Sequence, residues 1–140
     1  LPYCSKSSEQ PQLQSEHTQK IKGVLEYIGL HYTENISIES LASSCYFSEY
    51  HFMRFFKKYV GMSCLDYIKS LRLQKAADLL EQQELSITDA AMTAGFSSLS
   101  YFYREFKKRY GTTPRQFIHS LPERQHTNRA STPGSPFSPL

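Results

Sequence analysis

Apolar residues recur at helical spacing through residues 17–120, and no stretch of this segment alternates apolar and polar residues as a half-exposed strand would. Ile21, Leu25 and Ile28, for example, fall on one face of a helix over residues 19–32. Serine or threonine at helix starts, and glycine or proline at helix ends, separate the periodic stretches. The pattern predicts an all-α fold of seven helices.

Capping residues set the expected bounds of the six later helices. The second is expected at residues 38–45, the third between its cap Ser48 and Gly61, and the fourth at residues 64–81. The fifth is expected between Ser86 and Gly95, the sixth at residues 98–110, and the seventh between Thr113 and Pro122.

The chain repeats itself, because residues 36–68 and 85–118 carry nearly the same pattern. At an offset of 50, Phe52, Arg54, Phe56, Lys57, Lys58 and Gly61 match Phe102, Arg104, Phe106, Lys107, Lys108 and Gly111. Each copy predicts a short helix, a tight turn and a second helix with a basic outer stripe. This is the plan of a helix-turn-helix unit, whose second helix enters the major groove of DNA. We therefore predict double-stranded DNA as the partner.

The repeat also predicts the domain organisation. Two helix-turn-helix subdomains are expected at residues 17–62 and 83–121, joined by a linker helix at residues 63–82. A helix of about 17 residues is roughly 25 Å long, a length suited to holding two recognition helices near one DNA turn apart. Residues 1–16 and 122–140 are rich in polar residues and proline and are expected to be flexible tails.

The second helix of each copy has an aromatic inward face and a polar outward face. The residues predicted to contact bases are Tyr50, Met53, Arg54, Ser100, Tyr103 and Arg104. The residues predicted to contact phosphates are Ser48, His51, Lys57, Lys58, Ser98, Tyr101, Lys107 and Lys108. Arginine can donate two hydrogen bonds to guanine O6 and N7, and a lysine one turn further suits phosphate. For the two serines we favour a helix-capping role over DNA contact.

Charge distribution supports this partner more than total charge does. The net charge of +3 is modest, but residues 96–115 hold five basic residues and one acid. The main alternative is a helical protein-interaction module that does not bind DNA, for which an apolar groove rather than a basic stripe would be expected. Because phosphate binding weakens steeply with salt and an apolar interface hardly does, salt dependence distinguishes the two.

Other functional classes lack their signatures in this sequence. It has no glycine-rich phosphate loop, no paired carboxylates and no arrangement of nucleophile and base, so we expect no enzyme and no cofactor. The histidines and cysteines show no metal-ligand spacing. Three cysteines, an odd number, suggest free thiols and a cytoplasmic protein. No apolar run approaches 18 residues, so no membrane contact is expected.

The segment from Gly95 to Pro114, GFSSLSYFYREFKKRYGTTP, resembles the DNA-binding domain of the AraC/XylS family of bacterial transcription regulators. The resemblance covers about residues 20–118. It implies promoter DNA binding as an activator or repressor, and contact with RNA polymerase. It also implies a separate effector-binding or dimerising domain, most often upstream. Because the chain does not begin with Met, we expect a fragment that lacks this domain.

The first copy departs from the second at the turn. Tyr46 stands where the second copy has Gly95, and a left-handed backbone at tyrosine is strained, so the first turn is expected to close differently. Met53 is also a poor hydrogen-bonding partner for bases. The first unit is therefore expected to be the less specific one.

Overall fold

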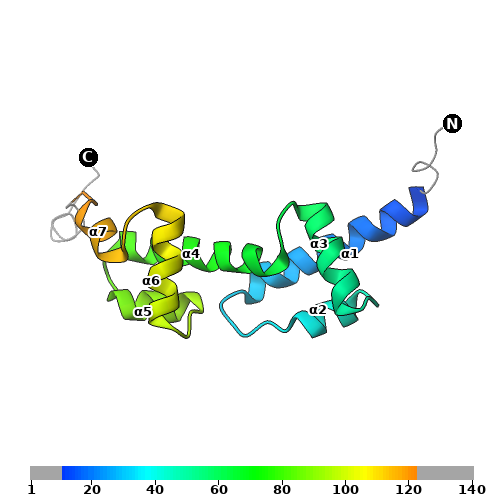
Figure 1. Ribbon diagram of the computed structural model, residues 1–140, viewed down its shortest axis with the longest axis horizontal. Coiled ribbons are helices and arrows are strands. Elements are labelled where there is room, and N and C mark those ends of the chain that lie inside the picture. Colours follow the sequence, from blue (N-terminus) through cyan, green and yellow to red (C-terminus); the bar gives the residue numbers. More distant parts are fainter. Residues whose placement is uncertain (1–10, 123–140) are drawn as a thin grey trace, which may run out of the picture. The chain divides into compact units, whose positions relative to one another are not determined.

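The computed structural model describes residues 11–122, and every regular element in this range is an α-helix (Figure 1). The helices are α1 (Pro11–His31), α2 (Ile38–Ser44), α3 (Glu49–Val60), α4 (Cys64–Gln82), α5 (Ile87–Ala94), α6 (Leu99–Tyr110) and α7 (Pro114–His119). The predicted seven-helix, all-α fold is therefore confirmed for the described residues. No helix among them combines the length and apolar character that a membrane span needs.

The chain divides into two compact units, and the boundary between Leu71 and Arg72 falls inside α4. The segment predicted as a separate linker is thus shared, since α4 supplies core residues to both units. Cys64 and Ile68 are buried in the core of the first unit, whereas the buried residues Leu73, Ala76, Ala77 and Leu80 belong to the second.

In the first unit, α1, α3 and the start of α4 surround an aromatic core. Phe52 and Phe56 of α3 are fully buried, and the ring of Phe56 lies 5.7 Å from that of Tyr67 in α4. Val24 and Ile28 on the buried stripe of α1 belong to the same cluster. Burial of each large side chain of this kind contributes about 1.5–3 kcal/mol, so the core holds α3 with its aromatic side inward.

The second unit repeats this arrangement with α5, α6 and α7. Phe102 and Phe106 of α6 are fully buried, and the Phe106 ring lies 5.4 Å from that of Phe117 in α7. The three alanines of α5 that face the core, Ala90, Ala91 and Ala94, are all fully buried. Their small side chains bring α5 close to its neighbours.

The turn before α3 adopts the same conformation as the turn before α6, so the prediction of a different closure was wrong. Tyr46 has a left-handed backbone with φ of 62°, and Gly95 has φ of 109°. In both turns the following amide bonds back to an alanine carbonyl: Phe47 N to Ala42 O at 2.9 Å, and Phe96 N to Ala91 O at 3.0 Å. The tyrosine ring is 90% exposed, so only the backbone is strained and the ring meets no obstruction.

Helix α1 begins at Pro11, whereas the predicted start was Gln19. The expectation of a flexible tail was therefore wrong for residues 11–16. Proline suits the first helical position, and tertiary contacts hold the early turns, because the His17 ring lies 5.3 Å from Phe55 and its Nδ1 lies 3.2 Å from the Tyr59 hydroxyl. The rest of the predicted tails, 1–10 and 123–140, lies outside the described residues.

We predict that Tyr46→Gly raises the free energy of unfolding by about 0.5–1 kcal/mol. Relief of the left-handed strain, worth about 1–2 kcal/mol, outweighs the extra backbone entropy that glycine loses on folding. Urea denaturation measures the difference. Gly95→Ala is the matched control and should lower stability by about 1 kcal/mol. A less stable Tyr46→Gly variant would mean that the tyrosine ring itself stabilises the turn.

Candidate nucleic-acid interface

Helices α3 and α6 are built and capped alike. Each has 12 residues, begins after a serine and ends at a left-handed glycine. The Ser48 hydroxyl accepts from the His51 amide at 3.1 Å, and the Ser98 hydroxyl accepts from the Tyr101 amide at 3.2 Å. The favoured capping role of both serines is confirmed. A phosphate contact by either serine remains a prediction.

The outward surface of α3 is exposed and centred on Arg54. The other predicted contact residues exposed on this helix are Tyr50, His51, Lys57 and Lys58. Arg54 Nη1 donates a hydrogen bond of 2.9 Å to the Tyr50 hydroxyl, and its guanidinium carbon lies 5.6 Å from the Tyr50 ring centre. Tyr50 and Arg54 therefore form one polar unit in which a terminal nitrogen of the arginine already has a partner.

The outward surface of α6 is centred on Arg104. The other predicted contact residues exposed on this helix are Ser100, Tyr101, Lys107 and Lys108. The guanidinium carbon of Arg104 lies 5.3 Å from the Tyr101 ring centre. Its Nε also lies 3.6 Å from a carboxylate oxygen of the next residue, Glu105.

Two predicted base-contact residues, Met53 and Tyr103, are less exposed than expected. Both are partly buried and pack against the hydrophobic clusters of their units. The Tyr103 ring meets the Phe102 ring edge-on at 6.0 Å. The two residues occupy equivalent positions at the border between the inward and outward faces, where helical periodicity alone assigns a side poorly. Their contact with bases remains a prediction.

Glu105 is a residue of this site that sequence reasoning did not single out. Its side chain is buried although it is charged. Its position matches Phe55 of the first copy, 50 residues earlier, which is also buried. The sequence did contain a signal for this residue: the acid Glu105 stands at the repeat position where the first copy has the core residue Phe55.

Basic residues near the ends of α3 and α6 admit a simpler explanation than DNA contact. Lys57 and Lys58 lie in the last turn of α3, and Lys107, Lys108 and Arg109 in that of α6, where cations interact favourably with the helix dipole. That effect decays within the last turn. It does not account for Arg54 and Arg104, which lie further from the helix ends.

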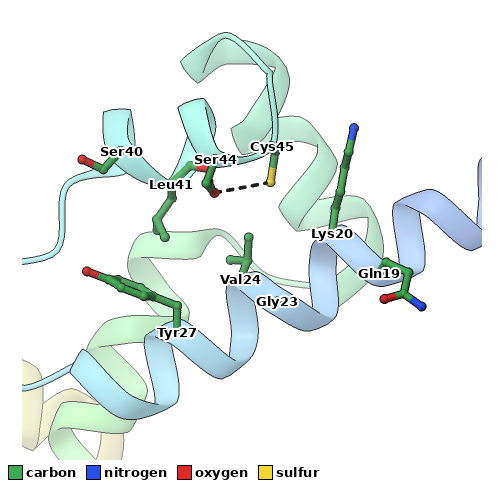
Figure 2. Close-up of a pocket in the computed structure, with 9 residues that line it drawn as sticks. All are labelled: Gln19, Lys20, Gly23, Val24, Tyr27, Ser40, Leu41, Ser44 and Cys45. Atoms are coloured by element: carbon green, nitrogen blue, oxygen red, sulfur yellow. Dashed lines mark hydrogen bonds between the residues drawn. The ribbon is translucent and has the colours of Figure 1, made fainter.

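A separate cleft of about 490 Å³ lies between α1 and α2 (Figure 2). The side chains around it come from α1, from α2 and from the residue that follows α2: Gln19, Lys20, Val24, Tyr27, Ser40, Leu41, Ser44 and Cys45, with Gly23 completing the lining. None of these residues is a carboxylate or a histidine, so the cleft contains no general acid–base pair of the kind that hydrolytic sites use.

The described residues contain no cluster suited to a metal ion. Cys45 and Cys64 are buried free thiols. Burial raises the pKa of the Cys64 thiol from its ordinary 9.0 to about 11. Since the thiolate is the reactive form, Cys64 is not poised as a nucleophile at neutral pH.

Comparison with known proteins agrees with the two helix-turn-helix units. A helix-turn-helix domain family matches residues 41–120. The chain is similar to the regulatory protein PocR of Salmonella typhimurium, with 32% identity over 125 residues. That match covers 89% of this chain but 41% of PocR, so the chain spans less than half the length of this relative.

Solved structures show the same fold. A probable AraC family transcriptional regulator from Rhodopseudomonas palustris matches with a TM-score of 0.66 and 29% identity, covering 74% of this chain and 99% of that one. The DNA-binding domain of the global transcriptional factor AdpA, solved with a target DNA, matches with a TM-score of 0.66 and 25% identity. This second match covers 79% of this chain and 94% of the AdpA chain.

We predict that Ser98→Ala lowers the free energy of unfolding by about 1 kcal/mol, whereas Ser98→Gly lowers it by only a few tenths. The alanine removes the hydroxyl cap of α6, and glycine at this position leaves the helix amides open to water. Thermal or urea denaturation measures both. Ser97→Ala, at the exposed neighbouring position, is the control and should change little. A Ser98→Ala variant as stable as the unmodified protein would contradict the prediction, and a loss of DNA affinity in the stable Ser98→Gly variant would show that the hydroxyl also contacts DNA.

Proposed function

Because this chain belongs to the AraC/XylS family of helix-turn-helix transcription regulators, we propose that α3 and α6 are the recognition helices with which it binds double-stranded DNA. DNA binding in transcription regulation is the function of this domain type. The observation that carries our assignment is the equivalence of α3 and α6, which share cap, buried phenylalanines and exposed arginine. A helix-turn-helix unit uses this second helix in the major groove.

Arg54 and Arg104 are proposed to contact bases. Both are exposed and lie near the middle of their helices, opposite the buried phenylalanines. A guanidinium can pair with O6 and N7 of guanine through two hydrogen bonds. Tyr50, Met53, Ser100 and Tyr103 are proposed to add hydrogen bonds or contacts to thymine methyl groups.

The lysines near the ends of α3 and α6 are proposed to bind phosphates, together with His51 and Tyr101. The four lysine side chains are exposed, so their ammonium groups are accessible to the phosphates of a DNA backbone. Such contacts position a protein on DNA without selecting its sequence, and they make affinity depend on salt.

The two units are proposed to occupy successive major-groove segments of one asymmetric site. One chain carries both recognition helices, and the outward residues differ between them, as Tyr50 and Ser100 illustrate. The site is therefore expected to have two unlike parts. No second copy of the chain is needed to supply the second recognition helix.

Further partners follow from the family and from the length of the relatives. We propose that the domain acts within a longer regulator that contains an effector-binding or dimerising part and contacts RNA polymerase. We also propose that it is not an enzyme and that it acts in the cytoplasm. The coverage of only 41% of PocR supports the existence of further domains in proteins of this kind.

Selection of bound fragments from a pool of random duplexes tests the proposed function directly. The expected result is one enriched sequence with two unlike conserved blocks, and binding that weakens steeply as salt rises. Failure to enrich any sequence, with affinity insensitive to salt, would favour the helical protein-interaction alternative.

Arg104→Ala is expected to weaken binding to the selected sequence by about 1–3 kcal/mol and to relax the preference at one base position. The loss arises because a bidentate contact discriminates one base from the other three. Binding to single-base variants of the site measures it. Unchanged affinity and preference would show that Arg104 contacts no base.

Lys107→Ala is expected to weaken binding to all duplexes alike and to reduce the salt slope by about one. A phosphate contact releases counterions but carries no sequence information. Titrations at several salt concentrations measure the slope. Lys22→Ala, which removes the same charge from α1, is the matched control and should leave the slope nearly unchanged. A base-specific loss in Lys107→Ala would contradict the phosphate assignment.

A further inference from the structure

Glu105 is a buried carboxylate within a strongly basic helix, the only charged side chain that is buried in the described part of the chain. Removing a carboxylate from water is costly unless cations or hydrogen-bond donors compensate it. The equivalent position in α3 holds Phe55, which fills the core at no such cost. The acid in α6 therefore requires cations or hydrogen-bond donors around it, which the phenylalanine in α3 does not.

The interactions of Glu105 include ion pairs with two predicted DNA-contact residues. Its Oε2 lies 3.6 Å from Arg104 Nε, and its Oε1 lies 3.7 Å from Lys108 Nζ. The carboxylate side chain is 7% exposed, whereas those of the two cations are 63% and 68% exposed. The buried carboxylate thus lies beside Nε, at the stem of the Arg104 guanidinium, and beside the charged Nζ of Lys108, while both cationic side chains stay largely exposed.

The geometry at Arg104 suits a bidentate base contact. The carboxylate meets Nε, at the stem of the guanidinium, and the Tyr101 ring lies 5.3 Å from the guanidinium carbon. With Nε facing the carboxylate, the N–H groups of Nη1 and Nη2 remain for a bidentate contact with O6 and N7 of guanine. Restraint of the stem reduces the side-chain entropy that Arg104 loses on binding, and the 63% exposed side chain keeps its tip accessible to a ligand.

Arg54 in the first unit is contacted at the tip of its guanidinium rather than at the stem. Its terminal Nη1 donates to the Tyr50 hydroxyl at 2.9 Å, and the next residue, Phe55, offers no charge to its stem. One N–H of the Arg54 tip is therefore engaged before DNA binds, and Nη1 keeps only its second N–H for a base. The two units therefore present an arginine at the same position, but Arg54 is contacted at its tip and Arg104 at its stem.

We propose that Glu105 is a positioning residue that prepares Arg104 for guanine, so that α6 imposes a stricter base preference than α3. This inference rests on the proposed role of Arg104 in base contact. Glu105 also cancels one positive charge of α6, which weakens binding by phosphate attraction alone. Both effects increase the ratio between the affinity for the correct sequence and the affinity for random DNA.

The test is Glu105→Gln, which keeps the shape of the side chain and removes its charge. Affinity is measured over a salt series for the selected site, for single-base changes at the Arg104 position, and for random duplex. The preference at that position should fall at least about 3-fold, part of the roughly 5- to 150-fold that a complete bidentate contact supplies. Binding to random duplex should become tighter because the net charge rises by one.

A purely structural role predicts a different result. The variant would then lose thermal stability and bind every duplex more weakly, with its base preference intact, and this outcome would overturn the proposal. Glu105→Phe, which copies the residue at the equivalent position of α3, is the second variant. It retains an apolar core and should show the same loss of preference as Glu105→Gln.

Arg104→Ala separates failure of this inference from failure of the proposed role of Arg104. If Arg104→Ala keeps the base preference, Arg104 is not a base contact, and its proposed role and the positioning role of Glu105 both fail, whereas DNA binding itself is tested by the fragment selection. If Arg104→Ala loses the preference but the Glu105 variants retain it, only the positioning role is overturned. In the Arg104→Ala background, Glu105→Gln should not change the preference further.

A measurement on the unmodified protein makes the test independent of whether the variants fold. In proton exchange measured by NMR, the Nε proton of Arg104 should exchange with water at least several-fold more slowly than that of Arg109 in the same helix. Equal exchange rates would show that the carboxylate does not hold the Arg104 stem, and would overturn the proposal.

Discussion

The burial of two phenylalanines from each recognition helix is the constraint on which the rest of the structure depends. Phe52 and Phe56 are fully buried in the first unit, and Phe102 and Phe106 in the second. A helix that buries positions four residues apart must turn its opposite face to solvent. In α3 and α6 that face carries the arginines and lysines. The position of the basic surface is thus set by apolar packing, since exposed ion pairs contribute only about 0–1 kcal/mol each.

Packing also explains why two different residues form the same turn. Tyr46 and Gly95 both adopt left-handed backbone conformations, although only glycine does so without strain. In each unit the amide after this residue bonds to an alanine carbonyl, and both alanines, Ala42 and Ala91, are buried. The core and these hydrogen bonds together impose the conformation on tyrosine. The relation of the short helix to the recognition helix is therefore kept in spite of the substitution.

With the backbone kept, the two copies differ in the chemistry around their central arginines. Tyr50 of α3 is replaced by Ser100 in α6, and Phe55 is replaced by Glu105. The first exchange decides whether a hydroxyl reaches the tip of the arginine, and the second decides whether a carboxylate reaches its stem. A repeated scaffold thus presents two central arginines in unlike surroundings, as the proposed asymmetric DNA site requires. The difference needs no change in helix length or capping, because α3 and α6 match in both.

The sequence by itself determined the helices, their serine caps, the repeat and the exposed arginines, because each follows from hydrogen bonds and periodicity within a few neighbouring residues. Helical periodicity also separated the inward phenylalanines from the outward charges. Four features were decided only by tertiary structure. They are the early start of α1 with His17 against Phe55, the left-handed Tyr46, the partial burial of Met53 and Tyr103, and the buried Glu105 beside Arg104. Each depends on how completely distant segments cover a side chain or restrain a backbone, which no local pattern records.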